Sequence, residues 1–110
     1  MAVRSAALLL AILHAPAFAE ARDLKAFYQE RCAVCHGLDG TGRGPNGVRL
    51  GGPNFAEGRW FAKQPEAALV TSILRGRGAM PGFRRQLSES DARRLLATVI
   101  RPLAARGKPA

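Results

Sequence analysis

Cys32-Ala33-Val34-Cys35-His36 is the segment around which the rest of this sequence can be understood. It holds both cysteines of the chain and one of its two histidines. The C-x-x-C-H pattern is typical of covalent attachment of a c-type haem. In such a site two thiols add across the vinyl groups of the porphyrin, and the histidine that follows faces the iron. The motif therefore predicts one haem, with Cys32 and Cys35 as thioethers and His36 as the proximal iron ligand.

Other sites that use a cysteine pair need residues that this chain lacks. A structural zinc site needs further ligands, but no other cysteine exists and the second histidine, His14, lies near the N-terminus. An iron–sulfur cluster would be short of two thiolates. A thioredoxin-type dithiol follows a strand in a βαβ unit, and no such pattern precedes Cys32. Haem attachment is the interpretation that the spacing favours.

Residues 1–19 have the three parts of a secretory signal peptide. Arg4 supplies the positive charge, an apolar run follows, and Ala17-Phe18-Ala19 is a small-x-small cleavage site. The apolar run is shorter than the roughly 20 residues that cross a bilayer. We expect export to the periplasm and cleavage after Ala19, which leaves residues 20–110 as a single domain. An oxidising compartment suits a cysteine pair that is chemically capped.

Periodic apolar residues predict three helices in the remainder of the chain. The first covers residues 22–31 and leads into Cys32, so that the haem motif lies on its last turn. The second covers residues 65–75 and starts with a proline, which suits the first helical position. The third follows a capping box formed by Ser88 and Asp91.

Glycine and proline interrupt this helical pattern. Residues 37–58 are rich in glycine and predict an extended loop. A loop of that length in a compact domain is explained if it wraps a ligand, because glycine lets the backbone approach a flat ring closely. Pro102 cannot donate a helical hydrogen bond, so we expect the third helix to kink or end close to Ile100. Residues 106–110 should fray.

Met80 is the only methionine besides the initiator. A lone methionine usually fills a gap in the core, but Met80 stands among glycine and proline in a loop, residues 79–83, between two predicted helices. The sequence therefore favours Met80 as the distal iron ligand. Ligation by a lysine and an open sixth position are the alternatives. His/Met ligation occupies both axial positions, which favours electron transfer over binding of a small substrate.

These features together resemble the small bacterial class I cytochromes c. The resemblance covers about residues 22–103. It rests on the C-x-x-C-H-G segment, the glycine run before Pro45, the Ala79-Met80-Pro81-Gly82-Phe83 segment and the amphipathic terminal helix. It implies an all-α cytochrome c fold of about three to four short helices, in which the first and last helices cross and one haem lies between the two loops.

The resemblance also implies roles for three further residues. Pro45 matches the proline whose carbonyl accepts a hydrogen bond from the proximal histidine, and Trp60 is similar in position to a tryptophan that binds a haem propionate. A half-buried packing role is the alternative for Trp60. Tyr28 matches the aromatic residue at the helix crossing. The terminal helix departs from the family pattern, because Thr98 occupies the neighbourhood in which an aromatic residue often lies.

The chain carries a formal charge of +9. Charge of this size concerns partners and association rates, not the fold. No nucleic-acid-binding motif is present, and secretion argues against that role. A cluster of four arginines around Met80 predicts a docking face for an acidic redox protein. Its members are Arg75, Arg77, Arg84 and Arg85. The alternatives are a solvated charged surface and contact with an anionic membrane surface.

Three hypotheses for function follow. The first is a periplasmic carrier of single electrons, which has no catalytic residues of its own. The second is a cytochrome subunit of a larger oxidoreductase, for instance one that oxidises sulfur compounds or alcohols. The third is a haem enzyme or gas sensor in which Met80 ligation is labile. The sequence does not name an electron donor or acceptor.

Overall fold

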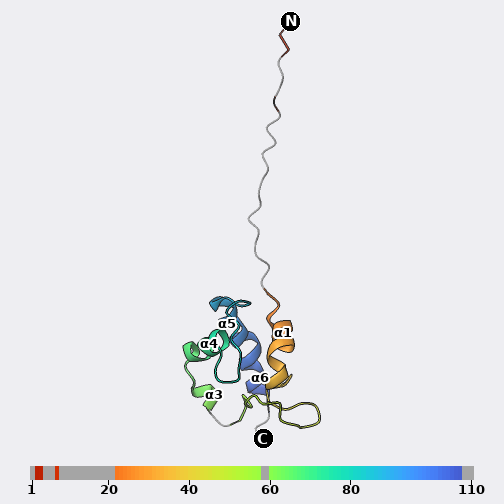
Figure 1. The fold of residues 1–110 in the computed structure, drawn as a ribbon, viewed down its shortest axis with the longest axis vertical. Coiled ribbons are helices and arrows are strands. Elements are labelled where there is room, and N and C mark those ends of the chain that lie inside the picture. Colours follow the sequence, from red (N-terminus) through yellow and green to blue (C-terminus); the bar gives the residue numbers. More distant parts are fainter. Residues whose placement is uncertain (1, 4–6, 8–21, 58–59, 108–110) are drawn as a thin grey trace.

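The computed structural model describes residues 2–3, 7, 22–57 and 60–107. Within these residues every regular element is helical, and the only β-type pairings are two isolated bridges. Figure 1 shows the helices gathered into one body, with α1 beside the long helix of the C-terminal part. The all-α fold class is confirmed. The predicted signal peptide lies almost entirely outside the described residues.

The haem motif lies at the end of one unbroken helical stretch. It consists of α1 (Leu24–Phe27), a π-helical turn (Tyr28–Cys32) and α2 (Ala33–His36). Asp23 caps the start, where its carboxylate accepts the amide of Ala26 at 3.0 Å. The helix is therefore longer than residues 22–31 and places the whole C-x-x-C-H segment in its last turns, next to the glycine loop.

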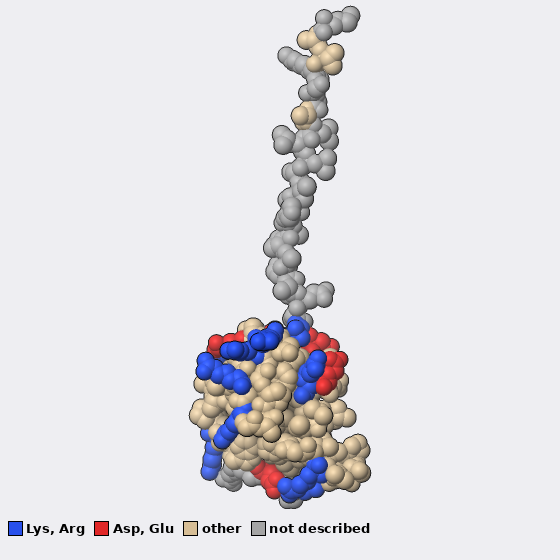
Figure 2. Space-filling view, viewed as in Figure 1, with Lys and Arg blue, Asp and Glu red and all other residues tan. Residues whose placement is uncertain are grey.

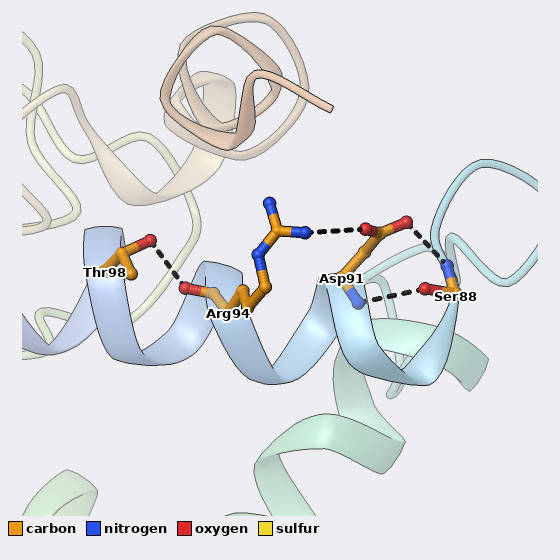
Figure 3. A network of polar contacts seen from close by, with 4 residues as sticks. All are labelled: Ser88, Asp91, Arg94 and Thr98. Carbon is orange, nitrogen blue, oxygen red and sulfur yellow. Dashed lines mark hydrogen bonds and ion pairs between the residues drawn. The ribbon is translucent and has the colours of Figure 1, made fainter. Parts of the chain in front are cut away.

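The C-terminal helix begins as the sequence predicts. Ser88 Oγ accepts the amide of Asp91, and the Asp91 carboxylate accepts the amide of Ser88, each at 3.0 Å (Figure 3). This reciprocal capping box satisfies two amides that the helix itself cannot pair. Arg94 lies one turn further on, 3.6 Å from the Asp91 carboxylate.

The C-terminal helix does not end near Ile100, which was one of the two outcomes predicted for Pro102. Three segments follow one another without interruption: α5 (Glu89–Leu95), a π-helical turn (Leu96–Ile100) and α6 (Arg101–Arg106). Pro102 lies in the first turn of α6. The π turn bonds the Arg101 amide to the carbonyl of Leu96, so the hydrogen-bond register changes immediately before the proline. Proline has no N–H to donate, and Pro102 lies at this change of register, where the regular i−4 hydrogen bonds of the α-helix are already interrupted.

The first and last helices pack together, as the resemblance implies. α1 contacts α5, and α4 also packs against α5 (Figure 1). The three largest fully buried side chains are Tyr28, Leu95 and Leu96, so the terminal helix contributes leucines instead of an aromatic residue. Thr98 is exposed, and its hydroxyl donates to the carbonyl of Arg94 at 2.6 Å (Figure 3).

The middle of the chain contains one helix more than predicted. α4 (Glu66–Arg75) follows Pro65, which is its N-cap and not its first helical residue. The short α3 (Trp60–Lys63) was not predicted, because four residues carry too little periodicity. Phe61 of α3 is buried, and the centroid of its ring lies 5.0 Å from that of Phe55. Residues 37–57 contain no helix or strand, which confirms the predicted loop.

Candidate haem site

His36 ends α2 and points its side chain into the protein. Its exposed fraction is 9%, and its ring stacks on Phe55 with centroids 4.5 Å apart. Cys32 is partly buried against the core, whereas Cys35 is exposed, and both thiols are free. Burial raises the pKa of the Cys32 thiol to about 11. The spacing of three residues brings the two cysteines to neighbouring positions on one side of the helix.

The glycine loop closes tightly over the end of this helix. The amide of Gly52 donates to the carbonyl of Cys35 at 2.8 Å, and the amide of Gly42 donates to the carbonyl of His36 at 2.6 Å. Carbonyls in the last turn of a helix have no partner within it, so the loop supplies the missing donors. A Cβ atom on Gly52 would lie 2.5 Å from the oxygen of Cys35. Only glycine permits this approach.

The ring of His36 is oriented by the same loop. A Cβ atom on Gly52 would lie 2.8 Å from Nδ1, so this nitrogen faces the loop backbone. Nδ1 is buried and makes no hydrogen bond within the described residues. Burial lowers the pKa of His36, and the neighbouring backbone of Pro53 opposes this effect. A neutral imidazole with Nδ1 toward the loop leaves Nε2 as the nitrogen for a metal.

The structure does not support the role predicted for Pro45. This residue is exposed in a turn in which Gly44 and Val48 are bonded through their backbones at 2.9 Å. The loop doubles back between Gly42 and Gly52, which brings Pro53 to the histidine and carries Pro45 away from it. The Gly-Gly-Pro sequence at 51–53 is the local signal that could have suggested this close approach.

Met80 lies in a tight turn after α4. Arg77 and Met80 exchange both backbone hydrogen bonds at 3.0 Å, and Gly78 adopts a φ of 57° between them. The chain beyond the turn is bonded to the end of α4, because Phe83 donates to the carbonyl of Ile73 at 2.9 Å. The Met80 side chain is partly buried against the core. The turn is therefore a well-braced support for a side chain at the edge of the core.

Trp60 lies at the rim of a hollow next to the histidine. The hollow has a volume of about 280 Å³ and is also lined by Arg43, Arg49, Gly52 and Pro53. Trp60 is 38% exposed and meets the ring of Phe61 edge to face. The two arginines were not singled out in the sequence, because nothing local distinguishes them from the other arginines. Glu57 lines the same hollow, so its charged side chains are two arginines and one carboxylate.

Three of the four arginines predicted around Met80 line one part of the surface. Arg75, Arg84 and Arg85 line a second hollow of about 570 Å³, between the end of α4 and the segment after the Met80 turn. The ion pairs of the described residues join Arg93 to Glu66 and Glu89, and Arg94 to Asp91. None of them neutralises the arginines at Met80. Figure 2 shows basic side chains at several places on the visible face.

The residues present fit a covalent haem. No group of three or more histidine, cysteine or acidic side chains that could hold a bare metal ion occurs among the described residues. A haem needs less from the protein, since its porphyrin supplies four ligands to the iron. The free cysteine pair, the buried imidazole whose Nδ1 faces the loop, and the approach that only a glycine allows agree with such a group.

Comparison with known proteins identifies the family. Residues 19–97 match the family model described as "Cytochrome C oxidase, cbb3-type, subunit III". The chain belongs to this family of c-type cytochromes. The cytochrome is thus a small class I c-type cytochrome with covalently bound haem c, and it functions in electron transfer.

Curated relatives of the cytochrome include proteins of two kinds. It is 34% identical over 82 residues to the cbb3-type cytochrome c oxidase subunit CcoP of Azospirillum brasilense, covering 74% of the cytochrome and 28% of that subunit. It is 34% identical over 76 residues to a cytochrome c6 of a Synechocystis species, covering 69% of the cytochrome and 60% of the relative. The cytochrome therefore spans less than a third of that oxidase subunit.

Solved structures agree with the fold. The c-type cytochrome KustC0563 aligns with a TM-score of 0.58 and 25% identity, covering 79% of the cytochrome and 100% of that chain. The c-type cytochrome NirC aligns with a TM-score of 0.57 and 30% identity, covering 72% and 86%. These likenesses place the described helices in the cytochrome c fold.

Proposed function

We propose that this cytochrome is a periplasmic carrier that exchanges single electrons with other redox proteins through the edge of its haem. The bound haem supplies an iron that alternates between Fe(II) and Fe(III). The observation that carries the proposal is the pair of supported side chains, His36 at the end of the haem helix and Met80 in its braced turn. Two axial protein ligands leave no position on the iron for a substrate.

Each side chain of the site has a separate task in this proposal. Cys32 and Cys35 hold the porphyrin as thioethers, while His36 and Met80 are the axial ligands. The backbone beside His36, at Pro53, is placed to receive the Nδ1–H and to keep the ring in one orientation, which would raise its basicity as a ligand. Arg43, Arg49 and Trp60 line the hollow that would take the carboxylates of the haem.

The ligand set is tested by a near-infrared spectrum of the ferric protein with Met80→Ala as the variant. We expect a methionine-to-iron charge-transfer band in the unmodified protein and its loss in the variant. Leu74→Ala is the control, because Leu74 is also partly buried against the core and lies close to the turn. A band that persists in Met80→Ala, or that is absent from the unmodified protein, would rule out this ligand.

We also propose that the arginines around Met80 steer anionic partners to the haem edge. The support is charge: Arg75, Arg77, Arg84 and Arg85 surround the Met80 turn, and no described ion pair neutralises them. Such a field raises association rates with anionic partners and is screened by salt. An acidic redox protein is the partner that suits this surface.

Small redox complexes test the docking face without a known partner. The variant Arg77→Glu/Arg84→Glu should slow electron exchange with anionic hexacyanoferrate and reduce its salt dependence. It should accelerate exchange with cationic hexaammineruthenium. Lys25→Glu/Lys63→Glu makes the same change in net charge on α1 and α3, at two exposed positions. Equal rates and salt slopes for the two double variants would show that net charge alone acts, and would reject the docking face.

A second candidate is a role as one subunit of a larger redox complex. The match to cbb3-type oxidase subunits over part of their length favours it. Purification under mild conditions from the native source distinguishes the two, because a subunit would co-purify with a larger assembly. A haem enzyme or gas sensor would bind carbon monoxide readily in the ferrous state, whereas a stable Met80 ligand would hinder it.

Periplasmic location is proposed on the strength of residues 1–19 and their resemblance to a signal peptide. None of the described helices is long and apolar enough to cross a membrane. The mass of the protein after export tests the proposal, because cleavage after Ala19 leaves a chain that starts at Glu20. A retained N-terminus would contradict it.

A further inference from the structure

Tyr28 makes a buried side-chain hydrogen bond whose position suggests a role. Its hydroxyl donates to the carbonyl of Gly37 at 2.7 Å, and its side chain is only 1% exposed. Burial raises the pKa of the Tyr28 phenol, so it stays protonated and remains a donor.

The acceptor of this bond is the residue directly after His36. Gly37 ends the haem helix with a φ of 82°, and its amide donates to the carbonyl of Ala33 at 2.8 Å. Its carbonyl also accepts the amide of Gly40 at 3.2 Å. The phenol therefore fixes the peptide that leaves the histidine, at the point where the chain turns from helix into loop.

Tyr28 lies where three parts of the chain meet. A Cβ atom on Gly40 would lie 3.3 Å from Cβ of Leu103 in α6, 3.2 Å from the ring of Phe55 and 3.9 Å from the Tyr28 hydroxyl. The haem helix, the start of the glycine loop and the C-terminal helix are thus packed around this hydroxyl. Phe55 is also the ring on which His36 stacks.

We propose that Tyr28 is a positioning residue for His36, which acts by holding the carbonyl of Gly37 and thereby the orientation of the imidazole. This inference rests on the proposed His36/Met80 ligand pair. An imidazole held in one orientation would present Nε2 to the iron of a bound haem. Loss of the hydroxyl frees the helix end, and the His36/Met80 pair is held less well.

The variant Tyr28→Phe tests the proposal, because it keeps the buried ring and removes only the hydroxyl. Amide hydrogen exchange on the haem-loaded protein should become roughly fivefold faster at Gly40 and Gly42, as expected for the loss of one buried hydrogen bond. Amides within α5 should not change. The reduction potential should fall and the ferric near-infrared band should weaken, because methionine ligation is what raises the potential.

Phe27→Leu is the matched control. Phe27 is the neighbouring core aromatic, 6% exposed and packed edge to face on Phe83, and it makes no bond to the loop. This variant should lower global stability while the potential and the relative exchange of Gly40 and Gly42 stay unchanged. The proposal is overturned if Tyr28→Phe leaves both the potential and the loop exchange unchanged, or accelerates exchange evenly through the protein. Absence of the near-infrared band from the unmodified protein would instead reject the ligand pair itself.

Discussion

Gly52→Ala should disturb the haem site through a single methyl group. Gly52 does not have a positive φ, so alanine can adopt its backbone conformation. The conflict is steric, because the new Cβ would lie 2.5 Å from the carbonyl oxygen of Cys35 and 2.8 Å from Nδ1 of His36. Carbon and carbonyl oxygen normally approach to about 3.3 Å. The loop must therefore withdraw by roughly 0.8 Å from the haem helix.

This displacement has a cost that can be estimated. It weakens the hydrogen bond from Gly52 to Cys35, which contributes about 1 kcal/mol, and overpacking of a closed site adds about 1–3 kcal/mol. The free energy of unfolding should fall by roughly 2–4 kcal/mol, which in a domain of this size lowers Tm by about 10 °C or more. Denaturant unfolding of the haem-loaded protein, followed by helical circular dichroism, measures this change.

Gly44→Ala is the control for this prediction. Gly44 also lacks a positive φ, and its new Cβ would lie 3.3 Å from the Asn46 side chain, 3.5 Å from the Leu50 side chain and 3.9 Å from the carbonyl oxygen of Val48. Its cost should stay within about 0.5 kcal/mol, as for other surface substitutions. The reasoning is refuted if Gly52→Ala unfolds at the same denaturant concentration as Gly44→Ala and has an unchanged visible spectrum.

Three further predictions concern the C-terminal helix. Ser88→Ala should lower the free energy of unfolding by about 1 kcal/mol, whereas Ser90→Ala, at an exposed position in the same turn, should not. The hydrogen bond from the backbone amide of Ser88 is the main cause that lowers the pKa of Asp91. The stability that the ionised Asp91 carboxylate contributes is therefore present above the unfolded pKa of about 3.9 and is lost as pH falls through the lower folded pKa. Asp91→Asn should reduce this loss when stability is measured in an acid titration. Pro102→Ala should change stability by less than about 1 kcal/mol, and a gain of ~3 kcal/mol would show that the proline breaks a regular helix after all.

Features that depend on neighbouring residues were predictable. The C-x-x-C-H segment, the capping box at Ser88 and the long glycine loop each depend on residues within a few positions of one another. The pattern of apolar residues placed the three longer helical stretches, since that pattern arises from burial of one face. The helix does not end before Pro102 as the sequence allowed, because the change to a π-helical turn, which accommodates the proline, has no signal in the local sequence.

In the candidate site, too, some features were predictable from the sequence and others depend on the fold. Sequence singled out His36 and Met80, because each is the only residue of its kind available for the task. It did not identify Pro53, because the choice between Pro45 and Pro53 depends on how the loop doubles back over many residues. The hollow that Arg43 and Arg49 line was missed for the same reason, since it exists only after the loop has folded.

The sequence by itself thus determined that this cytochrome carries a covalent haem, and it singled out His36 and Met80 as the candidate iron ligands. Those are properties of residue type and short spacing, which do not depend on the path of the chain. Only the tertiary structure decided how His36 is held, by Gly52 and Pro53 on one side and through the Tyr28–Gly37 bond at the end of its helix. Such contacts join residues from separate segments, and their positions follow from packing of the whole domain.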